Sequence, residues 1–229
     1  MAERPGPENG AMPRRFSRAL PTLTNLVGSL NDRLLFAVPK KGRLNQAATE
    51  LLAGSDIQFH RHNRLDIALV KNLPLALVFL PASDIPTFVG EGRVDLGITG
   101  RDVVAEHEAT TPPSETSGIE ELMDLEFGRC KLQVQVPEKG NLHSAEALVG
   151  RTLVTSFTGL SEQYFREMEK KVAQANGDAN GEGAEKLKTT IKYVGGSVEA
   201  ACALGVADGI VDLVGESLPE RKSMFGLRV

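Results

Sequence analysis

Short apolar runs alternate with amphipathic stretches from residue 34 onward, and this alternation predicts an α/β protein. Residues 75–80 are apolar throughout, as expected for a strand covered on both faces. Residues 130–136 alternate strictly between apolar and polar side chains, as expected for a strand with one polar face. The other predicted strands are 34–38, 57–59, 65–69, 94–99, 153–155, 191–194 and 209–214, and the predicted helices are 44–52, one within 81–90, one opening at 101, 160–172 and 198–204.

A polar, proline-bearing linker over residues 106–118 divides this pattern into two α/β lobes. We expect lobe I over residues 34–105, lobe II over 106–214 and a divergent tail over 215–229. The order of the elements favours mixed sheets with helices on both faces, and two such lobes would enclose a central cleft. Within lobe II, the glycine-rich polar stretch 174–185 predicts a mobile loop.

The first 33 residues differ in composition from the rest of the chain. Residues 13–30 are rich in arginine and poor in acids, which loosely fits a mitochondrial targeting segment. Pro13 and Pro21 break any amphipathic helix there, so we favour a disordered extension, or an upstream start codon, over residues 1–33.

Charge and cysteine content narrow the class of protein. The 229 residues carry a formal net charge of −4, which gives no support for nucleic-acid binding. No apolar run approaches the length of a membrane span. The two cysteines, Cys130 and Cys202, are far apart in apolar surroundings, and we interpret them as reduced core thiols of a cytoplasmic protein.

Residues 92–100 are the most informative segment of the chain. The strand predicted there stops on Thr99 and Gly100, and a helix can open at the next residue. Gly97 and Gly100 lack a Cβ atom, so a ligand can approach the backbone, and free amides at a helix start attract anions. The segment therefore suits a phosphate or a carboxylate; the alternative is a tight turn with no ligand.

Other charged residues also follow predicted strands. Lys40, Lys41 and Arg43 place three cations after the first strand, which suits a polyphosphate, although a solvated basic turn explains them equally well. Arg64 and Asp66 could clamp a base or a ribose. Asp84 stands where a helix begins, so helix capping is its simplest explanation.

A second glycine-bearing turn repeats the arrangement in lobe II. Gly195, Gly196 and Ser197 follow a predicted strand, and Glu199 lies in the first turn of the helix after them. Two such turns facing one cleft indicate a phosphorylated ligand. Metal chemistry has weaker support, because His60 and His62 share a strand face with no third ligand and no zinc-spaced cluster is present.

Several segments, in order, resemble the ATP phosphoribosyltransferase family, and most closely its fungal-type sequences. They include Phe36-Ala-Val-Pro-Lys-Lys-Gly-Arg-Leu44, Ala82-Ser-Asp-Ile-Pro-Thr-Phe-Val-Gly90, Phe127-Gly-Arg-Cys-Lys-Leu132, Gly196-Ser-Val-Glu199 and Asp208-Gly-Ile-Val-Asp-Leu-Val214. The resemblance implies a two-lobe, periplasmic-binding-protein-like (type II) fold with mixed sheets and both substrates in the central cleft. The resemblance runs from about residue 26 to residue 214, and its matching segments also include 64–66 and 92–100.

The resemblance implies transfer of the phosphoribosyl group of phosphoribosyl pyrophosphate to N1 of ATP, with Mg²⁺. This reaction is the first step of histidine biosynthesis, and the full-length family form is expected to be a homo-oligomer. No catalytic residue is assigned. The substrate-binding residues implied are Lys41, Arg43, Arg64, Asp84, Gly97, Thr99, Gly100, Gly196, Ser197, Glu199 and Asp212.

The end of the chain departs from the family pattern. After Val214 the family has a Ser/Thr-Gly-x-Thr loop for the 5′-phosphate of phosphoribosyl pyrophosphate, followed by a return into lobe I. Here the chain reads Gly215-Glu-Ser-Leu-Pro, so we expect a truncated chain with lobe I incomplete, without the C-terminal domain of long forms. Two alternatives stay open: a non-catalytic two-lobe protein that binds a small anion, and a regulatory subunit that pairs with an intact copy.

Overall fold

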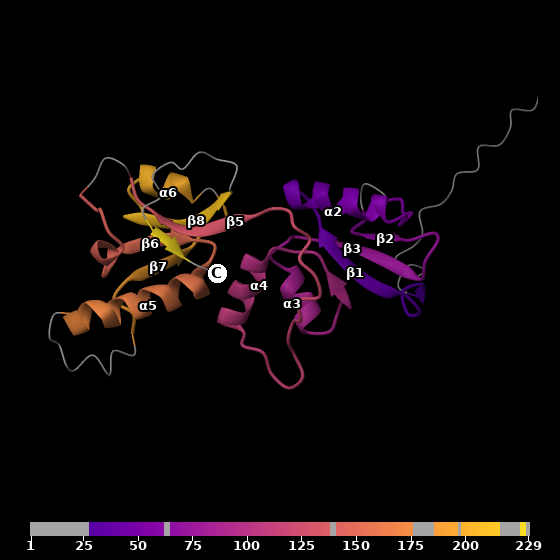
Figure 1. The fold of residues 1–229 in the computed structure, drawn as a ribbon, viewed down its shortest axis with the longest axis horizontal. Helices are drawn as coiled ribbons and strands as arrows, with labels where there is room; N and C mark the ends of the chain where they lie inside the picture. Colours follow the sequence, from indigo (N-terminus) through magenta and orange to yellow (C-terminus); the bar gives the residue numbers. More distant parts are fainter. Residues whose placement is uncertain are drawn as a thin grey trace, which may run out of the picture.

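The chain forms two mixed β-sheets, each with helices on both faces (Figure 1). This arrangement is seen in a computed structural model that describes residues 28–61, 65–137, 141–175, 186–196, 198–215 and 225–227. Helix α4 (Arg101–Thr110) belongs to the first half of the chain and lies between the two sheet units.

The first sheet has the strand order β2-β3-β1-β4, with β1 parallel to both of its neighbours and β2 antiparallel to β3. Its strands are β1 (Leu34–Pro39), β2 (Ile67–Leu69), β3 (Leu75–Leu80) and β4 (Leu96–Gly97), and its helices are α2 (Arg43–Gly54) and α3 (Ile85–Gly90).

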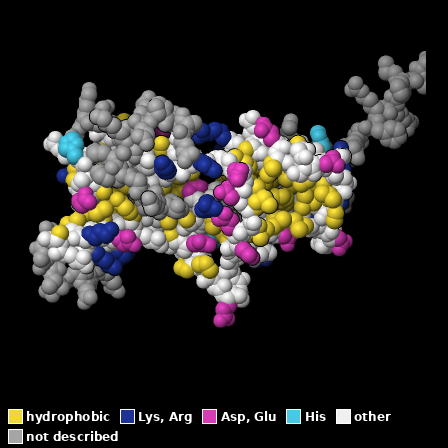
Figure 2. All heavy atoms as spheres, viewed as in Figure 1, with side chains coloured by type: hydrophobic (Ala, Val, Ile, Leu, Met, Phe, Trp, Pro, Cys, Tyr) yellow, Lys and Arg dark blue, Asp and Glu magenta, His cyan; other side chains and the backbone are white. Residues whose placement is uncertain are grey.

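Alternation along β1 decides which helix covers which face. Val38 packs with Leu52 of α2 in one buried cluster, whereas the preceding residue, Ala37, packs with Ile85 of α3 in another. Hydrophobic side chains remain visible over β1 and β3 on the face shown in Figure 2. The sheet is therefore held by a core on each side, with part of one apolar face at the surface.

The second sheet has the order β7-β6-β8-β5-β9, in which β6 is parallel to β7 and β8, and β5 is antiparallel to β8 and β9. Its elements are β5 (Cys130–Gln135), η1 (Glu146–Leu148), β6 (Thr152–Thr155), α5 (Thr158–Ala175), β7 (Thr190–Tyr193), α6 (Glu199–Ala203), β8 (Gly209–Gly215) and β9 (Phe225–Leu227).

Helices α5 and α6 cover opposite faces of this second sheet. Phe165 of α5 is fully buried against Leu153, whereas the neighbouring strand residue Val154 packs beneath α6. Both tyrosines of the chain lie in this unit: Tyr164 is half-buried beside Phe165, and Tyr193 is exposed at the end of β7.

The expected strands and helices are largely confirmed, with differences at their ends. Strand β3 has the predicted bounds, but β4 keeps only two of the six residues predicted for it. Residues 57–59 form no strand; Phe59 makes a single bridge to Val70. Helix α4 continues to Thr110, through the first five residues of the predicted linker, and within that part Glu106 accepts hydrogen bonds from amides of α5.

The interpretation of both cysteines as core thiols is wrong for one of them. Cys202 is half-buried, but Cys130 is exposed, because it begins β5 ahead of the residues that reach the core. The predicted extension, the predicted mobile loop and the tail lie mostly outside the described residues. Among the residues that are described, no helix has the length and apolar character needed to cross a membrane.

Candidate functional site

Six of the eleven predicted site residues lie at or just after the carboxyl ends of strands in the first sheet. Strands β1, β3 and β4 are parallel, so their carboxyl ends meet at one edge of the sheet. Lys41 and Arg43 follow β1, Asp84 follows β3, and Thr99 follows β4. The Thr99 hydroxyl donates a hydrogen bond of 2.8 Å to the carbonyl oxygen of Ala82, which joins the last two turns.

Lys40, in the basic turn, is paired with an acid of the same sheet unit. Its Nζ lies 2.8 Å from Oδ2 of Asp66, and Arg61 reaches the other oxygen at 3.4 Å while stacking 4.0 Å from the ring centre of Phe79. The hydrogen bond from Lys40 is the main reason that the pKa of Asp66 lies below its ordinary value. Asp66, predicted as a clamp for a base or ribose, is therefore engaged in an ion pair.

Lys41 and Arg43 stand at a helix start that no side chain caps or neutralises among the described residues. Helix α2 begins at Arg43, after Gly42 in a left-handed conformation (φ 84°), with no acidic residue in its first turn and no side-chain cap. Both cations are exposed, and neither makes an ion pair within the described ranges of the chain. The positive end of a 12-residue helix and two cations together suit a phosphate group.

Asp84 does not cap its helix, so the simplest expectation for this residue is wrong. It occupies the N-cap position of α3, but its side chain makes no hydrogen bond to the helix. Its Oδ1 instead accepts a hydrogen bond of 3.0 Å from the Ser83 hydroxyl. Asp84 is therefore an exposed carboxylate at the same sheet edge as the basic turn.

Packing accounts for two of the predicted glycines. A Cβ at Gly97 would lie 2.6 Å from Cγ2 of Ile85, and a Cβ at Gly100 would overlap the carboxylate of Asp102. That carboxylate accepts hydrogen bonds from its own amide and from that of Val103; burial outweighs these bonds and raises the pKa of Asp102. At the start of α4 the protein itself supplies the anion, so a ligand anion would have to displace Asp102.

A second set of candidates lies on the second sheet, toward the carboxyl ends of its parallel strands. Glu199 opens α6, Gly196 lies in the turn before it, and Asp212 is half-buried in β8. Burial is the main cause that raises the pKa of Asp212, and the negative charge of Glu199 raises it further. Glu199 therefore adds negative charge to a place where burial already disfavours the ionised form of Asp212.

Gln133 is a polar residue of this region that sequence reasoning did not select. It pairs with Asp212 across β5 and β8, so the two side chains share one face of the sheet. Its side-chain oxygen is buried with no hydrogen-bond partner among the described residues. The strict alternation along β5 marked Gln133 as part of a polar face, but only the strand register shows that this face includes Asp212.

Two predicted residues, Arg64 and Ser197, lie outside the described residues, as does His62 of the histidine pair. Within the described ranges, no group of three or more histidine, cysteine or acidic side chains is arranged to hold a metal ion.

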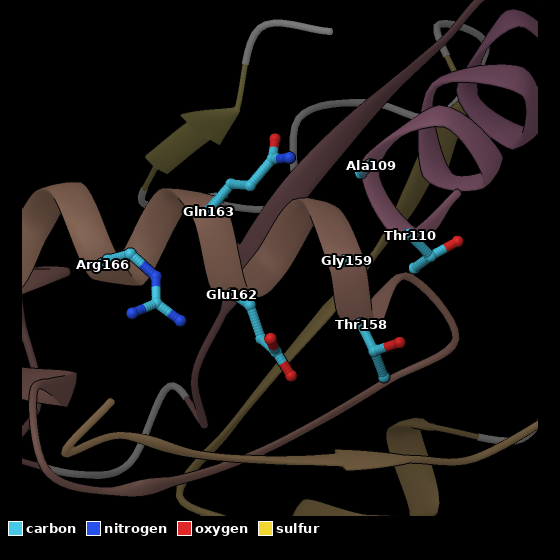
Figure 3. A pocket seen from close by; sticks show the side chains of 7 residues that line it. All are labelled: Ala109, Thr110, Thr158, Gly159, Glu162, Gln163 and Arg166. Atoms are coloured by element: carbon cyan, nitrogen blue, oxygen red, sulfur yellow. The ribbon is translucent and has the colours of Figure 1, made fainter. Parts of the chain in front are cut away.

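The joint between the two units is polar. Acidic and basic side chains lie near one another where the units meet (Figure 2). An open groove of about 400 Å³ runs between the end of α4 and the start of α5, and none of the predicted site residues lines it. Thr158, Glu162 and Arg166 lie along one side of α5 in this groove (Figure 3).

The sequence and the fold are both similar to those of known proteins. The family model described as HisG: ATP phosphoribosyltransferase matches residues 81–221. The ATP phosphoribosyltransferase of Yarrowia lipolytica is 63% identical over 190 residues, which are 83% of this chain and 58% of that protein. That of Schizosaccharomyces pombe is 59% identical, over 83% of this chain and 59% of its own length. That of Saccharomyces cerevisiae is 54% identical, over 83% and 58%.

A solved structure supports the fold. The ATP phosphoribosyl transferase (HisG:HisZ) complex from Thermotoga maritima superposes with a TM-score of 0.58 at 21% identity, covering 80% of this chain and 74% of that one. The predicted α/β class with two lobes and mixed sheets is thereby confirmed. The chain spans about 58% of the length of the curated relatives named above. On the family model and these identities, the chain belongs to the ATP phosphoribosyltransferase family.

Proposed function

We propose that this chain carries the substrate-binding edges of an enzyme that joins N1 of ATP to C1′ of phosphoribosyl pyrophosphate. The products are N1-(5-phosphoribosyl)-ATP and pyrophosphate, in the first step of histidine biosynthesis, which we place in the cytoplasm. The observation that carries the proposal is the start of α2, where Lys41 and Arg43 are exposed and make no ion pair among the described residues. Exposed cations at a helix start are what a pyrophosphate or triphosphate group requires.

The reaction is a displacement at an anomeric carbon. The bond from N1 of adenine to C1′ forms, the bond from C1′ to the pyrophosphate oxygen breaks, and the electron pair leaves with pyrophosphate. Lys41 and Arg43 would hold phosphate oxygens, so that charge building up on the leaving group meets cations already in place. Positioning supplies much of the remaining acceleration, because two bound substrates react as one molecule.

The second edge suits the sugar rather than the phosphates. Glu199 and Asp212 are hydrogen-bond acceptors when ionised, and ribose hydroxyls are donors. Burial, and to a lesser extent the charge of Glu199, raises the pKa of Asp212, and a ligand that donates hydrogen bonds to both carboxylates would offset both effects. We therefore assign the cationic edge of the first sheet to phosphates and the acidic edge of the second sheet to a sugar.

The residues present fit Mg²⁺ as a partner of the substrate phosphates. Mg²⁺ is usually bound by one or two carboxylates together with phosphates and water, so a cage of protein ligands is not required. Glu199 and Asp212 offer carboxylate oxygens, and burial together with the charge of Glu199 disfavours an ionised Asp212 that no cation compensates. When bound, the ion would neutralise charge on pyrophosphate. We propose a homo-oligomer for the longer form of the family.

Arg43→Ala tests this assignment. The variant should bind phosphoribosyl pyrophosphate about tenfold or more weakly, because a charge-assisted hydrogen bond contributes about 1.5–3 kcal/mol. Its melting temperature should stay that of the parent, because Arg43 is exposed. Titration calorimetry with each substrate and Mg²⁺ measures the Kd, and a turnover assay separates a transferase from a protein that only binds anions.

Arg93→Ala is the matched control, because Arg93 is an exposed arginine in the turn after α3, away from the start of α2. An unchanged Kd in Arg43→Ala, or an equal loss of affinity in Arg43→Ala and Arg93→Ala, would refute the role proposed for Arg43.

A further inference from the structure

Helices α4 and α5 belong to different sheet units, and one carboxylate joins them. Glu106, in the second turn of α4, directs its side chain to the start of α5. Its Oε1 accepts hydrogen bonds from the Gly159 amide at 2.7 Å and the Thr158 hydroxyl at 3.3 Å, and its Oε2 accepts one from the Leu160 amide at 2.9 Å. Two first-turn amides of α5 are thus satisfied by a residue more than fifty positions away.

Helix α5 has no acidic residue of its own at its start, so a carboxylate from another element can bind there. Helix α5 has 18 residues, so its start carries a full partial positive charge, yet its first turn holds no acidic residue. Helix α4, in contrast, begins with its own Asp102 on its first amides. Helix α4 therefore supplies to the start of α5 the negative charge that it also supplies to its own start.

Close packing at the same point depends on a glycine. A Cβ at Gly159 would lie 2.7 Å from Cγ2 of Thr110 and 3.1 Å from Cβ of Ala109, both at the end of α4. Carbon atoms in contact normally stay about 3.5–4.0 Å apart, so any larger residue at 159 would push the two helices apart. The hydrogen bonds of Glu106 and the missing side chain of Gly159 thus define one contact between the lobes.

The two helices in this contact begin within a few residues of the two candidate substrate-binding edges. Helix α4 starts directly after Thr99 and Gly100 at the first sheet edge, and α5 starts three residues after the end of β6 in the second sheet. We propose that Glu106 is a positioning residue that fixes the angle between the two lobes, and so the spacing between the phosphate edge and the sugar edge. Its effect on substrates rests on the proposed function, but its effect on the lobes does not.

Glu106→Gln is the central test, because glutamine has the same shape but loses the charge and one acceptor oxygen. Nuclear magnetic resonance on the ¹⁵N-labelled chain reports two quantities. The amides of Gly159 and Leu160 should exchange with solvent about tenfold or more faster than in the parent. Residual dipolar couplings of the strand amides should fit one rigid body in the parent and require two independent bodies in the variant.

Glu108→Gln is the matched control: it makes the same change two residues along α4, where no hydrogen bond to α5 is present within the described residues. It should leave both quantities unchanged. Gly159→Ala, which keeps Glu106, should also separate the lobes into two bodies. Adding Thr110→Ser removes the Cγ2 atom at 2.7 Å and should restore part of the single-body fit.

Glu106→Gln with dipolar couplings that still fit one body would overturn the proposal, even with faster amide exchange, because Glu106 would then only cap α5. If the dipolar couplings of Glu106→Gln require two bodies while its substrate Kd values are unchanged, Glu106 does fix the angle between the lobes, but that angle does not control substrate binding. If Glu106→Gln requires two bodies and the parent binds neither substrate, the role of Glu106 between the lobes is supported and the proposed function is refuted.

Discussion

Gly97→Ala separates a packing role for this glycine from a role in holding a ligand. Gly97 lies in β4 opposite Ala37 of β1, and an added Cβ would lie 2.6 Å from Cγ2 of Ile85 and 3.1 Å from Cγ2 of Val89. Ile85 is only 1% exposed, so its methyl group has no free space to enter. Helix α3 must therefore move away from the sheet by about an ångström to restore normal contact distances.

Overpacking of this kind costs about 1–3 kcal/mol. For a protein of this size each kcal/mol lowers the melting temperature by about 2–4 °C, so Gly97→Ala should melt about 2–12 °C below the parent. Thermal unfolding followed by circular dichroism, with urea unfolding as a second measure, gives the value. Substrate Kd values should not change, because the added methyl group contacts α3 rather than a ligand.

Gly54→Ala is the control substitution. A Cβ at Gly54 meets nothing within 4 Å, and this residue ends α2. The change should be neutral or stabilise the chain by up to about 1 kcal/mol, because alanine favours a helix over glycine. A Gly97→Ala variant as stable as the parent but unable to bind phosphoribosyl pyrophosphate would refute the packing argument and return Gly97 to the ligand.

Two carboxylates give predictions with opposite dependence on pH. Burial alone would raise the pKa of Glu169, but hydrogen bonds from Lys188 and Thr189 bring the pKa below its ordinary value of 4.5. The contribution of Glu169 to the stability of the fold is therefore present above pH 4.5 and is lost as the pH falls through the lowered pKa. Glu169→Gln should cost about 1 kcal/mol at pH 7, and the difference from the parent should shrink below pH 4.5; a constant difference down to pH 3 contradicts this. Burial raises the pKa of Asp102 above its ordinary value of 3.8, so Asp102→Asn should melt no lower than the parent at pH 7, with any gain vanishing below pH 3.8. A lower melting temperature at pH 7 would mean that the charge of Asp102 stabilises α4 more than its burial costs.

Periodicity in the sequence was enough to predict most strands, because apolar alternation and apolar runs follow directly from which faces are buried. Strand β3 has its predicted bounds for this reason. Strand β4 is shorter than predicted because only Leu96 and Gly97 pair with β1. The apolar pattern of the neighbouring Val94 and Ile98 reflects their burial, not a longer strand.

The candidate site was harder to predict, because contacts between distant residues leave no local pattern. The glycines at 97 and 100 suggested an approach for a ligand, whereas Ile85 and Asp102 occupy that space. The acid at 106 looked like part of a polar linker, although its partners are amides at the start of α5. The roles of the predicted substrate-binding residues stay predictions that the variants above test.

The placement of the tyrosines gives one lobe an intrinsic fluorescence signal that the other lobe lacks. The chain has no tryptophan and two tyrosines, and both tyrosines belong to the second sheet unit. Emission excited near 280 nm therefore reports on that unit alone, through a half-buried ring at Tyr164 and an exposed ring at Tyr193. Circular dichroism averages over both units, so two melting curves from one sample, one by each method, would reveal whether the lobes unfold together. A tryptophan placed in the first lobe would give that lobe a signal of its own.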